Sequence, residues 1–495
     1  MNRLPTPRIV TAFALATMAS TAVACNTRGA TSRSPEANAP RLSPAPAVAY
    51  KTPISFDEAK PILDARRADL PDGLRALPPA GLASAWPAWV QRRDREIRAR
   101  LEQGDEDSIV NLWLYGTSFT SRPRASARAM PTLADRTRAE ELLLGRLDDL
   151  VDALAAPAAG EERLRFAREV IARSGIDVAT PDGRDRARRY LIDIRERVLA
   201  DTARYQRSAE SASRLADSNA KLAAYATVYR DRGLSSDTSI NADFSIDRAL
   251  DAIAAKALAG RRSVGRVAVI GPGLDFTDKA QGYDFYPQQT IQPFAVIDSL
   301  RRLDLASSNL RLTTFDLSPR VNRHLDAAIG RARAGRAYVV QLPLDPDTAA
   351  HRWNPELVSY WRRFGDRIGD EVDPIRPPAS AGAVRVRAMA VRPEVVAAVD
   401  AQDLNVVLEA AAGDSYDLIV ATNVLVYYGR FEQALALANI AKMLRPGGLF
   451  LTNYAVSPAP PIDAAPRLVT TVEFDRQHNG DTIFCYVRNA SRPTP

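Results

Sequence analysis

At residue 264 the hydrophobic pattern of this chain changes in a way that leaves few folds open. Beyond it, apolar runs of four to eight residues alternate with segments of helical periodicity. The runs are Val267–Ile270, Leu310–Phe315, Tyr338–Leu342, Val384–Val391, Leu418–Ala421 and Leu449–Thr452, and the helical segments are 290–303, 319–333, 354–368 and 431–444. Short buried strands that alternate with helices predict an α/β fold with a doubly wound, mostly parallel sheet.

The two flanks of this region follow other patterns. Leu468–Phe474 and Thr482–Val487 are joined by a polar turn that contains Asn-Gly, which predicts a terminal antiparallel hairpin. Upstream, apolar stripes at helical spacing predict helices over 137–156, 184–206, 208–232 and 245–259. We therefore expect an all-α domain over 51–260 and the α/β domain over 261–495. The helix at 245–259 directly precedes the first strand, so it is expected nearest to any site there.

The amino terminus has the pattern of an export signal. Arg3 and Arg8 precede the uncharged, apolar run Ile9–Ala24, and Ala-Val-Ala leads into Cys25. Small residues before a cysteine resemble a bacterial lipobox, which predicts an exported, membrane-anchored lipoprotein lipidated at Cys25. A plain secretory signal and an uncleaved anchor are the alternatives, and the chain is cytosolic if residues 1–25 are not a true signal. Residues 26–50 are rich in Ala, Pro, Ser and Thr, which predicts a disordered linker.

Composition argues against several classes of protein. The chain has 495 residues and only two cysteines, which excludes a disulfide framework and a cysteine zinc ribbon. The three histidines, His324, His351 and His478, are far apart in sequence, so no metal site is expected. The net charge of +7 comes from basic residues interspersed with acidic ones, and no nucleic-acid partner is expected. Membrane contact is expected only through the amino-terminal lipid or anchor.

A glycine turn follows the first strand of the α/β region. The strand ends in Gly271-Pro272-Gly273, where missing side chains let a ligand approach the backbone. The next strand ends at Asp316, and an acid at this place can accept both ribose hydroxyls of an adenosine ligand. Asp316 also fits the N-cap of a helix that begins near Pro319, and the residue alone does not decide between the two roles.

Two later motifs make the pattern more specific. Residues 416–428 read Tyr-Asp-Leu-Ile-Val-Ala-Thr-Asn-Val-Leu-Val-Tyr-Tyr, and residues 443–451 read Met-Leu-Arg-Pro-Gly-Gly-Leu-Phe-Leu. With the glycine turn and the final hairpin, they make residues 264–490 resemble a class I S-adenosylmethionine-dependent methyltransferase. Asn423–Tyr427 and Asp403-Leu404-Asn405 are most similar to the chemotaxis-receptor (CheR-type) branch. The receptor substrate does not carry over, because the resemblance ends with this core.

The resemblance implies S-adenosylmethionine as the cofactor. It places the cofactor-binding residues at Gly271, Gly273, Asp275, Asp316, Asp403, Leu404, Asn405 and Asn423. The chain departs from the family at Val269, where an acid usually stands, and at Asp275, where a third glycine is common. We expect Asp275 to replace the missing acid and hold the methionine ammonium; otherwise the site binds the cofactor weakly or holds a related ligand.

Residues 275–292 form an insertion that is rich in acids and aromatics. It is either a lid or substrate platform, with Tyr283, Asp284 and Tyr286 as candidates, or a loop whose aromatics pack on the helical region. Tyr427 and Tyr428 follow the strand after which the family places its substrate-facing residues, although alternation requires one of them to be core. The candidate catalytic residues are therefore Tyr283, Tyr427 and Tyr428.

Three functions remain open at this point. The first is a methyltransferase acting on an oxygen or nitrogen of a small molecule or protein side chain. No Asn-Pro-Pro-Tyr run follows the 416–421 strand, and no catalytic cysteine is available, which disfavours methylation of nucleobases. The second is an exported, catalytically silent binding protein on the same fold. The third is a nicotinamide oxidoreductase, which is disfavoured because this chain lacks the third glycine of the dinucleotide-binding turn.

Overall fold

A computed structural model describes residues 51–489 except 126–132, 158–160, 215–231, 259–262, 278–282, 350, 412–414 and 457–464. The expected signal with Cys25, the 26–50 linker and most of the helix expected over 208–232 lie outside these residues. Within the described ranges, no helix combines the length and the apolar character needed to cross a bilayer.

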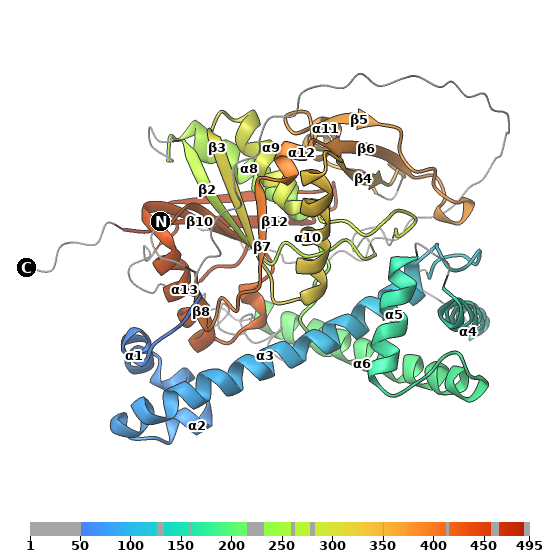
Figure 1. Cartoon of the computed structure of the whole chain (residues 1–495). Coiled ribbons are helices and arrows are strands. Elements are labelled where there is room, and N and C mark those ends of the chain that lie inside the picture. Colours follow the sequence, from blue (N-terminus) through green and yellow to red (C-terminus); the bar gives the residue numbers. More distant parts are fainter. Residues whose placement is uncertain are drawn as a thin grey trace, which may run out of the picture.

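The central sheet has seven strands, and two of them form the expected terminal hairpin. Its strands are β2 (Val264–Ile270), β3 (Ala306–Phe315), β7 (Val399–Gln402), β9 (Tyr416–Ala421), β10 (Leu444–Thr452), β11 (Leu468–Glu473) and β12 (Gly480–Val487). Their order across the sheet is β11-β12-β10-β9-β2-β3-β7 (Figure 1). β12 runs antiparallel to both of its neighbours, β11 and β10, and all other neighbouring pairs are parallel. This confirms the doubly wound, mostly parallel α/β sheet.

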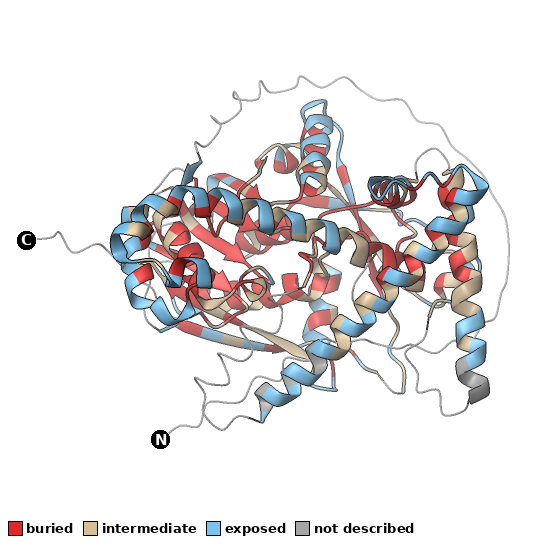
Figure 2. Cartoon of the chain, turned by 90° about the horizontal axis from the view of Figure 1, so that it is seen from below, coloured by how far each residue is buried: buried red, intermediate tan, exposed pale blue. Residues whose placement is uncertain are grey.

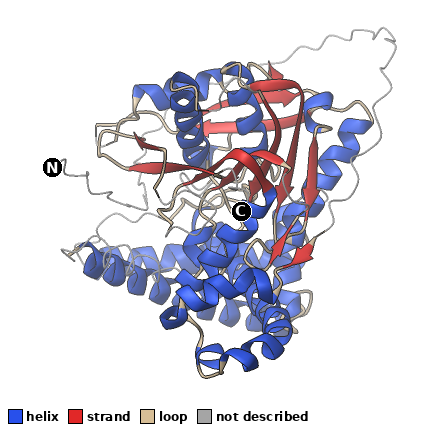
Figure 3. Ribbon diagram, turned by 90° about the vertical axis from the view of Figure 1, so that its left-hand side faces the viewer, coloured by secondary structure: helices blue, strands red, loops and turns tan. Residues whose placement is uncertain are grey.

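Both faces of the sheet are covered by helices (Figure 3). Val267 and Val269 of β2 pack in one core with α8 (Ile240–Ala255), α9 (Gln292–Arg302) and part of α10 (Pro319–Arg333). Ala268 and Ile270 point to the opposite core with α1 (Phe56–Ala65), the first half of α3 (Pro79–Tyr115) and α13 (Arg430–Met443). Successive side chains of a strand point to opposite faces, so an unbroken apolar run marks a strand buried on both.

Two of the expected strands are not in the central sheet. β4 (Tyr338–Leu344), β5 (Gly369–Val372) and β6 (Arg385–Val391) form a separate antiparallel sheet in the order β4-β6-β5. The prediction that 338–342 and 384–391 belong to the parallel sheet was therefore wrong. Arg385 and Arg387 alternate with apolar residues in β6, as in a strand with one exposed face, and the short strand β7 takes the place beside β3.

The remaining short elements connect these layers. They are β1 (Thr52–Pro53), α2 (Asp72–Arg75), α11 (Pro355–Arg363), α12 (Pro393–Val396), β8 (Glu409–Ala410) and 3₁₀ turns at Arg67–Asp69, Ala379–Ala381 and Leu425–Tyr427. β1 pairs with β8, so the start of the described chain is tied to the α/β part.

The described helices of residues 51–255 do not share a single hydrophobic core. The second half of α3 packs with α4 (Leu133–Ala155), α5 (Glu162–Arg173) and α6 (Pro181–Ser213) around a separate core, and we call this part the helical lobe. The first half of α3 and all of α8 instead share cores with the sheet. Figure 2 shows how buried residues are distributed over the strands and the helices around them. The expected boundary at residue 260 therefore does not coincide with a boundary between hydrophobic cores.

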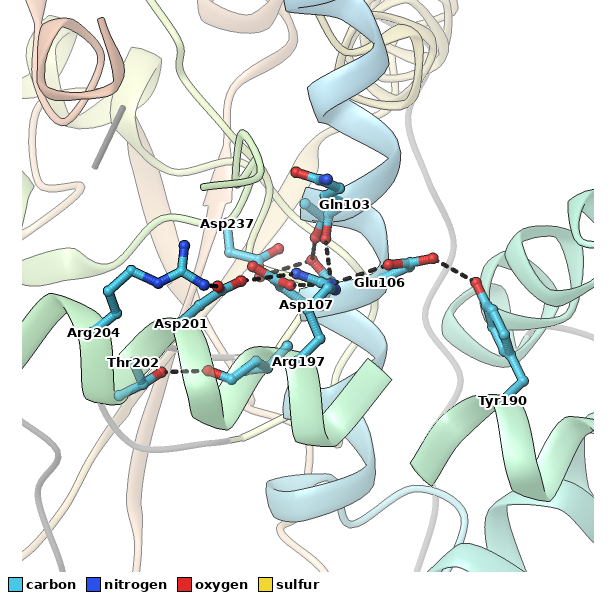
Figure 4. Close-up of polar contacts among 12 residues, drawn as sticks. Gln103, Glu106, Asp107, Tyr190, Arg197, Asp201, Thr202, Arg204 and Asp237 are labelled. Atoms are coloured by element: carbon cyan, nitrogen blue, oxygen red, sulfur yellow. Dashed lines mark hydrogen bonds and ion pairs between the residues drawn. The ribbon is translucent and has the colours of Figure 1, made fainter. Parts of the chain in front are cut away.

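Charged side chains hold α6 against α3 (Figure 4). The Arg197 guanidinium of α6 lies 2.7 Å from Asp107 and 3.0 Å from Glu106, both on α3, and the Tyr190 hydroxyl donates to Glu106 at 2.7 Å. Ser108, also on α3, donates to Asp237 at 2.9 Å in the segment that leads into α8. The long helix α3 thus connects the helical lobe to the edge of the central sheet.

Candidate functional site

The order of the central sheet reverses at β2, which has β3 on one side and β9 on the other. In open α/β sheets, ligands bind beyond the carboxyl ends of the strands at such a switch point. The segments that follow β2, β3, β9 and the neighbouring strand β7 contain all the residues predicted to bind a cofactor: Gly271, Gly273, Asp275, Asp316, Asp403, Leu404, Asn405 and Asn423. The fold therefore brings together residues that are up to 152 positions apart in the chain.

The two glycines have left-handed backbones, with φ of +68° at Gly271 and +67° at Gly273. A Cβ on Gly271 would lie 2.7 Å from Val424 Cγ2, in the loop after β9. A Cβ on Gly273 would lie 2.6 Å from the carbonyl oxygen of Ser236, in the segment before α8. The glycines therefore let two other segments approach the turn, and this packing alone requires them.

Asp316 lies across from the glycine turn and is 8% exposed. Its carboxylate accepts the Ser318 N–H at 2.7 Å, and the backbone N–H of Gly273 lies close enough to lower its pKa. Ser318, not Asp316, is the N-cap residue of α10. Burial raises the pKa of Asp316 to about 6, although both N–H groups oppose the shift. The carboxylate is thus held at the tip of β3 beside the turn, where an adenosine ribose would be recognised.

Asp275 is buried inside the insertion. One carboxylate oxygen accepts the Tyr286 hydroxyl at 2.7 Å and the Gln289 amide at 3.0 Å, while the other has no hydrogen-bond partner in the described part of the chain. Burial raises its pKa to about 6, despite the nearby charge of Arg163. Val269, at the position of the family's acid, is completely buried in the core and has no polar group to offer a ligand.

The Asp403-Leu404-Asn405 segment is bound to helix α3. The Arg98 guanidinium donates to both carboxylate oxygens of Asp403, at 2.8 and 3.0 Å, and Lys51 donates at 3.0 Å. Burial raises the pKa of Asp403, but Arg98 and Lys51 outweigh it and hold the pKa below its usual value. The Asn405 amide donates to Asp94 at 2.8 Å. Leu404 is core, so these three side chains have structural partners in the protein.

Asn423 lies at the exposed rim of the site and has φ of +57°, a conformation that asparagine tolerates better than most residues. Its backbone N–H donates to Asn453 at 2.8 Å, and the Asn453 amide donates back to the Asn423 side chain at 2.8 Å. Asn453 also donates to Asp481 at 3.0 Å. The sequence did not identify Asn453 and Asp481 as site residues. Their only signal is that Asn453 is polar and directly follows β10, and that Asp481 is polar and lies at the start of β12.

The described residues of the insertion pack against the rest of the protein. Tyr283 is 1% exposed, its hydroxyl donates to Asp345, and Arg124 lies 4.5 Å from its ring centroid. The Asp284 carboxylate accepts the hydroxyls of Thr117 and Ser118, just after α3, both at 2.7 Å. These contacts agree with a packed loop rather than with an open lid, and the catalytic role of Tyr283 stays a prediction.

Tyr427 and Tyr428 differ in their surroundings, although they lie at the end of a 3₁₀ turn and not in a strand, so the expected strand alternation is not the reason. Tyr428 is buried in the core with α3, and the Arg100 guanidinium lies 5.9 Å from its ring centroid. Burial raises the pKa of the Tyr428 hydroxyl above its usual range. Tyr427 is partly exposed, and its carbonyl accepts a hydrogen bond from Arg100 at 3.0 Å. Tyr427 is therefore the tyrosine of this pair that remains accessible to an acceptor.

A buried acid from α8 also lies near the site and was not among the predicted residues. Asp243 is 1% exposed, and neither of its carboxylate oxygens has a hydrogen-bond partner among the described residues. Gln292, at the start of α9, lies close enough to act on the pKa of Asp243 and donates to Thr422 at 3.0 Å, directly after β9. In the same described ranges, no group of three or more His, Cys, Asp or Glu side chains is placed to hold a metal ion.

Comparison with known proteins gives only distant likenesses. No protein-family model and no curated protein matches the chain. Among solved structures, the N-methyltransferase NodS from Bradyrhizobium japonicum with S-adenosylhomocysteine is 13% identical, with 49% of this chain and 87% of NodS covered and a TM-score of 0.24. The CMeT domain of the citrinin polyketide synthase is 13% identical, with 89% of this chain and 99% of that domain covered and a TM-score of 0.26.

A TehB-like methyltransferase from Corynebacterium glutamicum is 9% identical, with 49% of this chain and 88% of that chain covered and a TM-score of 0.19. Likenesses at these identities and TM-scores identify neither the family nor the activity of this chain. The order of its own strands and its own site residues are therefore the basis for a functional proposal.

Proposed function

We propose that this protein binds S-adenosylmethionine at the switch point beside β2 and transfers its methyl group to an oxygen or nitrogen of an acceptor. The observation that carries the proposal is the position of Asp316. Its carboxylate stands at the tip of β3, close enough to the backbone N–H of Gly273, in the turn after β2, for that N–H to lower its pKa. A buried acid beside a glycine turn at a switch point fits the two ribose hydroxyls of an adenosine ligand.

The residues at the carboxyl edge have distinct roles in this proposal. Asp316 accepts the ribose hydroxyls, and the backbone of Gly271 lines the approach to the cofactor. The main chain of 403–405 is the part of that segment that remains for cofactor contacts, because its side chains hold α3 or the core. When bound, the cofactor supplies a methyl group on a sulfonium. The protein then has to position the two reactants and exclude water.

The acceptor side of the site is the rim formed by Asn423, Asn453 and Tyr427. This rim is polar, and the proposed acceptor is a small molecule or a protein side chain. The motif Asn423–Tyr427 places the chain nearest to the CheR-type branch within this proposal. Burial raises the pKa of Asp481 to about 6, and Asn453 connects this acid to Asn423.

Calorimetric titration of the full-length chain tests the proposal. We expect S-adenosylmethionine and S-adenosylhomocysteine to bind with micromolar dissociation constants, and NAD and NADP not to bind at millimolar concentration. Preference for a nicotinamide dinucleotide would contradict the proposal and favour an oxidoreductase. Adenosylmethionine binding without methyl transfer to any of a panel of amines, carboxylates and hydroxyl compounds would favour the silent binding protein. Absence of adenosylmethionine binding would contradict the cofactor itself.

We also infer from the amino-terminal sequence that the chain is exported and anchored through a lipid on Cys25. In a bacterial host, we expect the wild type in the membrane fraction, labelled by radioactive palmitate. Cys25→Ser should lose the label and leave that fraction. Cys485→Ser is the matched control, because Cys485 is buried in β12 and should not affect labelling. Unlabelled wild-type protein in the cytosol would contradict the inference.

A further inference from the structure

Helix α8 buries two acids one turn apart, and only one of them is neutralised. Asp247 accepts hydrogen bonds from Ser299, Arg302 and Arg363, each at 2.7 Å. Asp243 is equally buried, but both of its oxygens lack a hydrogen-bond partner in the described part of the chain. Burial raises the pKa of Asp243 well above its usual value, and Gln292 only partly opposes this. A buried carboxylate is stable in its ionised form only when a charged or hydrogen-bonding partner compensates for the lost water, and otherwise it takes up a proton.

The position of Asp243 points to a ligand as its partner. The segment before α8 lies on the glycine turn, where the Leu274 N–H donates to Ser236 at 2.6 Å and the Thr238 N–H donates to Leu274 at 3.2 Å. Asp243 follows on the first turn of α8. Gln292, next to it, reaches Thr422 at the end of β9, and its own carbonyl oxygen has no partner among the described residues. These side chains therefore stand beside the switch point between β2 and β9.

The unpartnered atoms define the chemistry of the group that fits there. The two oxygens of Asp243 and the amide oxygen of Gln292 are all hydrogen-bond acceptors. No Arg, Lys or His contributes to the electrostatics of Asp243, in contrast to Asp247 with its two arginines. A positively charged group with several N–H donors complements such a set, and a primary ammonium has both properties.

We propose that Asp243, supported by Gln292, binds the α-ammonium of the methionine part of the cofactor. This rests on the proposed function. It assigns to α8 the acid that the sequence lacks at Val269, which is a buried core residue. It also replaces the expectation for Asp275, which has one unpartnered oxygen among the described residues but lies beside the charge of Arg163 and is hydrogen-bonded through its other oxygen to Tyr286 and Gln289.

The test uses two ligands that differ only in this ammonium: S-adenosylhomocysteine and its deamino analogue. Both are titrated into the full-length wild type and into Asp243→Asn, a neutral side chain of the same shape. The wild type should bind adenosylhomocysteine about tenfold or more tightly than the deamino analogue, as a hydrogen bond to a charged group implies. Asp243→Asn should bind the two ligands with affinities within about twofold of each other, because the selective contact is lost.

The ratio of the two affinities makes the test independent of a general loss of stability. Asp251→Asn, farther along α8 and paired with Arg248, is the control and should keep the wild-type ratio. A wild-type ratio that persists in Asp243→Asn overturns the assignment while the proposed function stands. If the wild type binds neither ligand, the proposed function fails and this inference fails with it. If Asp243→Asn does not fold, Gln292→Leu is tested in its place, and an unchanged ratio there overturns the assignment.

Discussion

Asp316→Ala is expected to weaken the binding of S-adenosylmethionine and S-adenosylhomocysteine by about 100-fold or more. The carboxylate would accept two ribose hydroxyls, and hydrogen bonds to a charged group contribute about 1.5–3 kcal/mol each. Asp316→Asn should have a smaller effect, because one acceptor oxygen remains. Calorimetry with both ligands measures the change. Asp326→Ala, an exposed acid on helix α10, which follows Asp316 in the chain, is the control and should bind like the wild type.

The same residue predicts a pH dependence of binding. Asp316 accepts both hydroxyls only when ionised, and burial raises its pKa to about 6. Affinity should therefore be complete above this pH and decrease as the pH falls through about 6. Asp275 has a pKa of about 6 as well, so the part due to Asp316 is the part that disappears in Asp316→Asn. Equal pH profiles for the wild type and Asp316→Asn would contradict the role of Asp316.

Gly104→Ala is expected to lower the free energy of unfolding by about 2–3 kcal/mol, although alanine is the better helix former. Gly104 lies inside α3, and a Cβ there would be only 1.9 Å from the carbonyl oxygen of Leu234. That contact is with backbone, so α3 and the segment before α8 must separate. The Leu234 N–H also donates to Arg100 at 2.9 Å, and this hydrogen bond should weaken. Denaturant unfolding of the full chain measures the change.

Gly330→Ala is the matched control, because it is the same substitution in a helix interior. Gly330 is exposed on α10, and a Cβ there would meet nothing within 4 Å. It should raise the free energy of unfolding by up to about 1 kcal/mol through helix propensity. Opposite signs for the two variants are expected. If Gly104→Ala is as stable as Gly330→Ala, the close approach of α3 to residue 234 is not a real constraint.

Local pattern identified six of the seven central strands, but it missed β7 and did not separate the second sheet from the first. Val267 to Ile270 is an unbroken apolar run, which a strand buried on both faces requires, and it does lie in the middle of the sheet. The apolar residues of 338–342 give the same signal, yet they pair antiparallel with 385–391. Strand partners depend on contacts made far along the chain, which periodicity does not encode.

The candidate site shows the same division. The positions of Asp316 and Gly271 were predictable because each directly follows a strand of the sheet, and their cofactor-binding roles stay predictions. The partners of Asp403 were not, since Arg98 lies 305 residues away and nothing in the Asp-Leu-Asn motif identifies it. Asp243 has no motif at all, and only its missing hydrogen-bond partners mark it.

The sequence by itself determined three properties: the α/β class, the helices that alternate with the central strands along the chain, and the positions where polar residues end those strands. These properties are local, because they depend on which side chains of one segment must leave water. The tertiary structure alone decided that 338–391 builds its own sheet, that α1, α3 and α8 share cores with the central sheet, and which acids are neutralised. Those outcomes depend on distances between segments remote in sequence, and a carboxylate's role is set by the partner that the fold brings within hydrogen-bond reach.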